Sequence, residues 1–176
     1  MSMRERLLLC AALLLVPAAA SAQTPQFGQP IAPADVAPWD ISIGPGGAGL
    51  PPGKGTAKQG EAVYLAKCQA CHGEKGAGKP NDQLAGGDGT IKSDKPAVKT
   101  VGSYWPYATT LFDYVRRAMP FNESKALTPD ETYAVSAYIL NLSNIVGADD
   151  VLDAQSLPKV QMPNKDGFIP FPRAPK

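Results

Sequence analysis

The sequence contains few of the side chains that bind metals or form cross-links. Its 176 residues include one histidine, three cysteines and four methionines, and aromatic residues make up only 7%. With one histidine, no site that needs two imidazoles can form within the chain. The few sulfur atoms likewise limit the candidate thiolate and thioether ligands, so each of them matters to the argument.

The sequence also lacks an excess of either charge and a long apolar run. It has 17 basic and 16 acidic residues, so charge gives no reason to expect a nucleic-acid or anionic-membrane partner. The longest apolar run, Leu7 to Val16, is shorter than the roughly 20 residues that span a bilayer. We therefore expect no membrane span in the mature chain.

The first residues have the pattern of a secretory signal peptide. Arg4 and Arg6 precede the apolar run, and Ala20-Ser21-Ala22 forms a small-residue cleavage site. We expect residues 1–22 to be removed after Ala22 and the mature chain to be exported, to the periplasm if the source is Gram-negative. Cys10 would leave with this segment, so that Cys68 and Cys71 remain.

Composition divides the remaining chain into three parts. Residues 23–55 are rich in Pro, Gly and Ala and predict an extended arm, which Trp39 and Ile41 should anchor to the body. Residues 56–147 have helical periodicity and predict one all-α domain. Residues 148–176 are again Pro-rich and predict an extended tail. No segment has the pattern of a β-strand.

Three helices are predicted in the central part. Thr56-x-x-Gln59 has the form of a capping box and opens a helix towards Cys71. The second spans about Ala108–Ala118, and the third begins at Thr128-Pro129 and ends near residues 144–147. In the first helix, Gly60 and Tyr64 have the spacing for a close crossing with Ala137 and Tyr138 of the third.

The strongest motif is Cys68-Gln69-Ala70-Cys71-His72. C-x-x-C-H is typical of c-type haem attachment, in which both thiols form thioethers and the histidine binds the iron. A structural zinc site needs four ligands, and the mature chain offers three Cys and His residues. A thioredoxin-like pair needs a βαβ context, which is not predicted. Three helices would bury only a thin core, and one covalently bound haem c would complete it.

The second axial ligand must come from another residue type, because His72 is the only histidine. Met119 ends the second predicted helix, directly before Pro120, and a thioether suits an electron-transfer iron. We therefore predict His72 and Met119 as the metal ligands. Core filling is the alternative role for Met119, and Met162, in the tail, is the alternative ligand.

Three further residues are predicted to contact the haem or its ligand. The carbonyl of Pro80 is a candidate acceptor for the second ring N–H of His72. Tyr104 and Trp105 combine large apolar rings with polar tips. Either ring could donate a hydrogen bond to a haem propionate or simply pack against the haem.

The residues from Gly55 to Leu142 resemble class I cytochromes c. The resemblance rests on Gly60 and Tyr64, the C-x-x-C-H motif, the Met119-Pro120 pair and the last helix with Ala137-Tyr138-Ile139-Leu140. It implies an all-α class I cytochrome c fold, here with an extended N-terminal arm and C-terminal tail.

Other segments resemble a narrower family, the cytochrome subunit of Sox sulfane dehydrogenase (SoxD-type) and single-haem cytochrome subunits of sulfite and sulfane dehydrogenases. This resemblance is more specific than the haem motif and implies a molybdenum partner of the sulfite oxidase type. The segments that carry it are Leu50–Gly53, Gly102–Phe121 and Met162–Phe168.

The sequence therefore predicts an electron-transfer protein that is not itself an enzyme. The sulfane dehydrogenase cytochrome has a second haem domain, whereas this sequence contains one C-x-x-C-H, so we expect a single-haem subunit or acceptor. A further cytochrome or an oxidase would take its electrons. The alternatives are a freely diffusing carrier to a terminal oxidase, a peroxidase-type haem enzyme and a gas-sensing haem protein.

Overall fold

A computed structural model describes residues 27–169 of the chain. The predicted signal peptide, residues 1–22, lies outside the described residues. Between residues 27 and 169, no helix combines the length and apolar character needed to cross a membrane. The chain divides into two units, with the boundary between Asp40 and Ile41.

The described part of the first unit contains one short helix, α2 (Pro33–Val36), which begins at a proline. Proline suits the first helical position because its fixed φ matches the helix and its missing N–H would have had no partner there. Every residue from Phe27 to Asp40 is exposed to solvent, including Trp39, whose exposed fraction is 75%.

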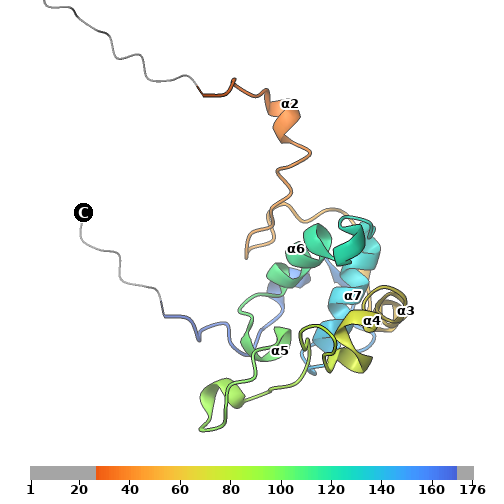
Figure 1. Cartoon of the computed structure of the whole chain (residues 1–176), viewed down its shortest axis with the longest axis vertical. Helices are drawn as coiled ribbons and strands as arrows, with labels where there is room; N and C mark the ends of the chain where they lie inside the picture. Colours follow the sequence, from red (N-terminus) through yellow and green to blue (C-terminus); the bar gives the residue numbers. More distant parts are fainter. Residues whose placement is uncertain (1–26, 170–176) are drawn as a thin grey trace, which may run out of the picture. The chain divides into compact units, whose positions relative to one another are not determined.

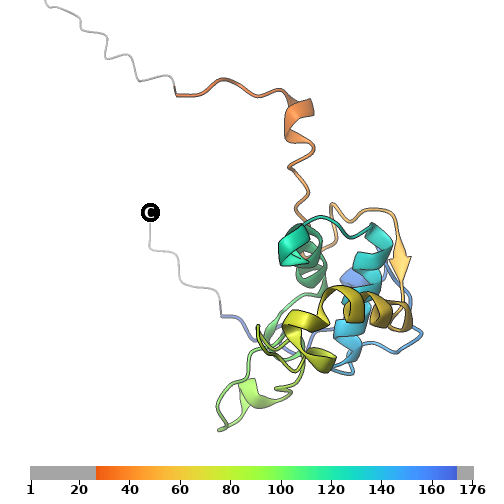
Figure 2. The same cartoon turned by 45° about the vertical axis from the view of Figure 1, so that its right-hand side comes forward.

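The second unit is mainly helical and is built around α7 (Pro129–Asn141). α7 packs against both α3 (Ala57–Lys67) and α6 (Ala108–Ala118), as Figures 1 and 2 show. The shorter elements are α4 (Gln69–His72), α5 (Val101–Tyr104), the 3-10 turns η1 (Glu74–Gly76), η2 (Thr90–Lys92), η3 (Phe121–Glu123) and η4 (Leu157–Lys159), and the strands β1 (Lys54–Gly55) and β2 (Leu152–Asp153).

The helix starts agree with the sequence prediction, and two of the ends differ. Thr56 and Thr128 both form complete capping boxes, and the bounds of α6 match the predicted range. α3 stops at Lys67 instead of continuing to Cys71, since the backbone kinks at Cys68 (φ −124°, ψ −37°). α7 ends at Asn141, earlier than predicted.

The crossing of α3 and α7 depends on the absence of a side chain at Gly60. A Cβ at this position would collide with the carbonyl of Ala134, so only glycine allows this approach. One turn later, the rings of Tyr64 and Tyr138 pack with their centroids 5.1 Å apart. The predicted crossing is therefore present. Tyr64 packs against Tyr138, as predicted. Gly60 contacts Ala134 instead of the predicted Ala137, which lies one turn later in α7.

The part of the second unit that precedes α3 is fixed to the helices by burial and by hydrogen bonds. Ile43 is buried, and its N–H donates a 3.0 Å hydrogen bond to Asp113 Oδ1 of α6. The hydroxyl of Tyr133 donates to the carbonyl of Pro51 at 3.0 Å. Of the two predicted anchors, Trp39 lies in the first unit and has an exposed fraction of 75%, whereas Ile41 is half-buried.

The segment after α7 packs onto the domain and adds a short strand. β1 pairs with β2 in antiparallel register, with Gly55 opposite Leu152, so the prediction of no strand was wrong at these positions. The sequence shows no alternation of apolar and polar residues there, because each strand has only two residues. Leu157 and Met162 of the tail are buried in the same core as the helices.

We expect Gly60→Ala to destabilise the protein by about 1–3 kcal/mol, because the added methyl group overpacks the contact with α7. Gly46→Ala is the matched control, since no atom lies within 4 Å of a Cβ there. The control should change the free energy of unfolding by less than about 0.5 kcal/mol. Denaturant titration followed by circular dichroism measures both. Equal stabilities for the two variants would contradict the role of Gly60.

Candidate functional site

The C-x-x-C-H motif forms a single helical turn directly after α3. The N–H of Cys68 donates to the carbonyl of Tyr64 at 2.9 Å, and the N–H of His72 donates to the carbonyl of Cys68 at 2.9 Å. Positions three and four apart share one face of such a turn. Cys68, Cys71 and His72 therefore lie along the same cavity.

The imidazole of His72 is oriented by a backbone carbonyl. Its Nδ1 lies 2.8 Å from the carbonyl oxygen of Asp82, and because a carbonyl can only accept, Nδ1 carries a proton; in the neutral ring the lone pair is then on Nε2. Such a partner fixes a metal-binding histidine in the required tautomer. The predicted carbonyl was that of Pro80. This was wrong by two residues, although Pro80 does line the cavity.

Hydrogen bonds tie the loop between His72 and Asp82 both to α3 and to the motif. Tyr64 is fully buried, and its hydroxyl donates to the carbonyl of Gly73 at 2.7 Å. The N–H of Gly78 donates to the carbonyl of His72, and that of Asn81 to the carbonyl of Cys71. Gly73 has a φ of 74° and no space for a Cβ beside Gly78, so this tight return requires glycine.

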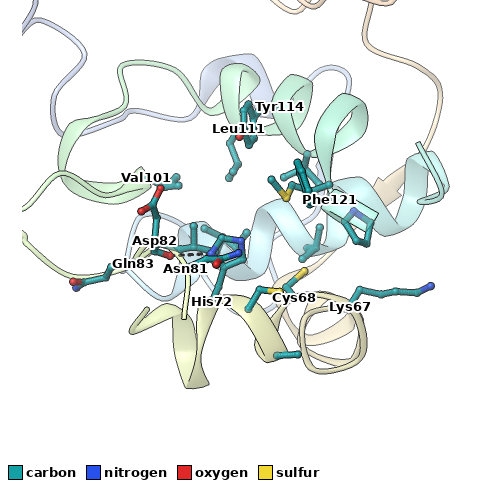
Figure 3. Close-up of a pocket in the computed structure, with 18 of the residues that line it drawn as sticks. Lys67, Cys68, His72, Asn81, Asp82, Gln83, Val101, Leu111, Tyr114 and Phe121 are labelled. Carbon is teal, nitrogen blue, oxygen red and sulfur yellow. Dashed lines mark hydrogen bonds between the residues drawn. The ribbon is translucent and has the colours of Figure 1, made fainter. Parts of the chain in front are cut away.

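The opposite wall of the cavity comes from α6 and the residues that follow it. Figure 3 shows Cys68 and His72 on one side and Leu111 and Phe121 on the other. The cavity has a volume of about 1050 Å³, and Met119 lies in its lining. The N–H of Met119 donates to the carbonyl of Val115 at 3.0 Å. Apolar side chains from four segments complete the wall: Leu84, Val101, Val115, Val135 and Ile139.

The structure separates the two candidate methionines. Met119 is half-buried in the cavity lining, whereas Met162 is 4% exposed, belongs to the hydrophobic core and does not line the cavity. A ligand must reach the cavity, so the geometry favours Met119 over Met162.

The two predicted aromatic contacts also differ. Trp105 lines the cavity, and its ring packs edge-on against Tyr114, with the centroids 5.8 Å apart. Tyr104 is not among the cavity residues. Its ring packs against Phe168 at 5.2 Å, and its carbonyl accepts a 2.8 Å hydrogen bond from Asn164 Nδ2. Tyr104 therefore holds the tail, which the sequence analysis missed.

The charged residues that line the cavity in the described part of the chain are all exposed: Lys67, Asp82, Lys99 and Glu123. Lys67 Nζ and Glu123 Oε2 lie 3.4 Å apart and join the two walls. Both side chains are exposed, so this pair contributes little to stability. Burial, reinforced by the neighbouring Cys71, raises the pKa of the Cys68 thiol to about 11. Cys68 is therefore neutral at ordinary pH while it remains a free thiol.

Comparison with known proteins agrees with this geometry. The family model for cytochrome c matches residues 57–143. A chain in the crystal structure of the sulfane dehydrogenase SoxCD from Paracoccus pantotrophus is 40% identical, with a TM-score of 0.76. That match covers 84% of this chain and 73% of the other. The chain belongs to the cytochrome c family. No curated protein matches the cytochrome's sequence.

Family membership makes this cytochrome an electron-transfer protein with covalently bound haem c and iron, and its fold is the predicted class I cytochrome c fold. The residues that line the cavity fit a covalently bound haem. A large, mainly apolar cavity has two thiols and an imidazole with a free Nε2 on one side and a thioether in its lining. The fit follows from the donor set and the space.

Sequence reasoning missed two residues that shape the site. Asp82 acts through its backbone carbonyl, which gives no side-chain signal. Tyr64 was expected only to fill space at the helix crossing, but its hydroxyl also fixes the loop after the motif.

We expect the haem of the mature protein, produced with cytochrome maturation machinery, to survive denaturing electrophoresis, because thioether bonds are covalent. The double variant C68S/C71S should lose the haem stain, and each single variant should keep one thioether and part of the stain. A stain that persists in the double variant would show that these thiols do not attach the haem.

Proposed function

We propose that this cytochrome is a periplasmic single-haem electron carrier that receives electrons from a molybdenum sulfite or sulfane dehydrogenase. In this proposal Cys68 and Cys71 attach the haem, and His72 and Met119 are its axial ligands. The observation that carries the proposal is the 40% identity to a chain of a sulfane dehydrogenase, extending over 84% of this chain.

The arrangement of the site supports electron transfer in preference to catalysis on a substrate. The bound haem would supply one-electron chemistry at its iron. His72 is held by the Asp82 carbonyl, and Met119 is held at the end of α6. If His72 and Met119 both bound the iron, they would leave no open coordination position for a peroxide or a gas, and an electron carrier needs none.

The partner class rests on the specific resemblance and on the surface of the cytochrome. The relative's name identifies a sulfane dehydrogenase, which fits the predicted molybdenum partner. The loop over residues 75–99 mixes five lysines with acidic residues, so electrostatic steering of encounter is weak. A bound subunit is less dependent on such steering than a carrier that must find its partner by diffusion.

The location is proposed from the N-terminal segment. Residues 1–22 combine a basic start, an apolar run and a small-residue cleavage site. Export would place the cytochrome where the SoxD-type relatives of the resemblance act. Cleavage after Ala22 is checked by the N-terminal sequence of the mature protein.

Met119→Leu should remove the methionine-to-iron absorption band, lower the reduction potential and let imidazole bind the haem. The change removes the thioether at nearly constant volume, and such exchanges usually cost less than about 1.5 kcal/mol. Visible spectroscopy, redox titration and ligand titration provide the measurements.

Met162→Leu is the matched control, because it makes the same substitution in the core outside the cavity. It should leave the band, the potential and the ligand reactivity unchanged. If both variants kept the band, Met119 would not be the ligand. If only Met162→Leu lost it, the tail methionine would be the ligand.

The partner is tested by searching the neighbouring genes for a molybdenum dehydrogenase subunit and producing the protein that such a gene encodes. On addition of a sulfur substrate, that subunit should reduce the ferric cytochrome by catalytic turnover, as followed by the haem spectrum. Omitting either the substrate or the dehydrogenase should abolish the reduction. Absence of such a gene or of reduction, with rapid oxidation of the ferrous cytochrome by a terminal oxidase, would favour the freely diffusing carrier.

A further inference from the structure

The part of the predicted arm that lies in the first unit, Phe27 to Asp40, carries exposed apolar side chains, and from here on the arm means these residues alone. The exposed fractions are 91% for Phe27 and 63% for Ile31, and Val36 is also exposed. No residue of α2, the only helix in the arm's described residues, is buried. Three large apolar residues are thus exposed within ten positions of one segment, which makes this segment a candidate interaction site.

The composition of the arm suits binding in an extended form to an apolar surface. From residue 23 to residue 53 the sequence contains no lysine or arginine, and Asp35 and Asp40 are its only acidic residues. Pro30, Pro33 and Pro38 restrict φ along the arm. A segment whose backbone is restricted loses less conformational entropy on binding than a flexible one.

Part of the arm belongs to the region that this cytochrome shares with its relative. The match to the sulfane dehydrogenase chain covers 84% of this chain, which is more than the unit from Ile41 to Lys176 contains. The matched region therefore extends into the residues before Ile41. A segment outside the compact haem-binding unit is thus retained in a chain from a dehydrogenase structure.

We propose that the arm is a docking segment that binds an apolar groove on the molybdenum dehydrogenase subunit, with Phe27 and Ile31 as its main anchors. This inference rests on the proposed function and adds the surface through which the subunits associate. The arm provides affinity, and the cavity edge on the second unit remains available for electron transfer. Affinity and electron transfer are thereby assigned to different parts of the chain.

The choice of Phe27 and Ile31 as anchors follows from how binding free energy is distributed over a protein interface. A few large side chains that enter apolar pockets provide most of the free energy of binding, and Phe27 and Ile31 are among the large apolar residues that the arm exposes. The low charge of the arm means that few ions must be desolvated when it is buried. A nucleic acid or an anionic membrane is a poor occupant, because the arm has no basic residue.

The test compares the affinity of the full-length mature cytochrome for the dehydrogenase subunit with that of Phe27→Ala/Ile31→Ala, using isothermal titration calorimetry. The double variant should bind more weakly by on the order of tenfold or more. The control Leu65→Ala/Val151→Ala removes two exposed apolar side chains from the second unit and should bind like the parent. Unchanged haem spectra and reduction potentials show that the site is intact.

The outcomes separate this inference from the proposed function. If the parent binds the dehydrogenase and the arm variant binds equally well, the arm is not the docking segment and the proposed function stands. If the parent does not bind at all, the proposed function fails and the arm inference with it. If the arm instead drives self-association of the cytochrome, as measured by analytical ultracentrifugation, the occupant is a second copy and the inference is overturned.

Discussion

The contact between α3 and α7 is the constraint on which the rest of the second unit depends. Gly60 lets the two helices approach until its backbone meets the carbonyl of Ala134, and the rings of Tyr64 and Tyr138 close the contact one turn later. α3 leads directly into the turn with Cys68 and His72, and α7 provides Val135 and Ile139 to the cavity. The helix crossing therefore sets the distance between the thiol-bearing turn and the apolar wall.

The same tyrosine links this packing to the chemistry of the site. Tyr64 fills the crossing with its ring and fixes the carbonyl of Gly73 with its hydroxyl. That hydrogen bond holds the start of the loop whose end supplies the Asp82 carbonyl to His72. Burial raises the pKa of Tyr64, so the hydroxyl keeps its proton and remains a donor. Packing of the core and orientation of the imidazole are thus coupled through one side chain.

The sequence predicted what depends on local patterns and missed what depends on tertiary contacts. The capping boxes at Thr56 and Thr128 and the bounds of α6 follow from short-range signals, and so does the C-x-x-C-H turn. The β1–β2 pairing and the burial of Ile43 depend on residues far away in the sequence. Tyr104 was misread for the same reason, since an aromatic ring gives no indication of whether it will face a cavity or the tail.

The use of a backbone carbonyl to orient His72 has a consequence for how this site can vary. Any amino acid has a carbonyl, so the side chain at position 82 is free to change its charge or size while the imidazole keeps its tautomer. What the site cannot tolerate is a change in the number of residues between Gly73 and Asp82, because that would move the acceptor away from Nδ1. Relatives should therefore differ in the identity of residue 82 but agree in the length of this loop.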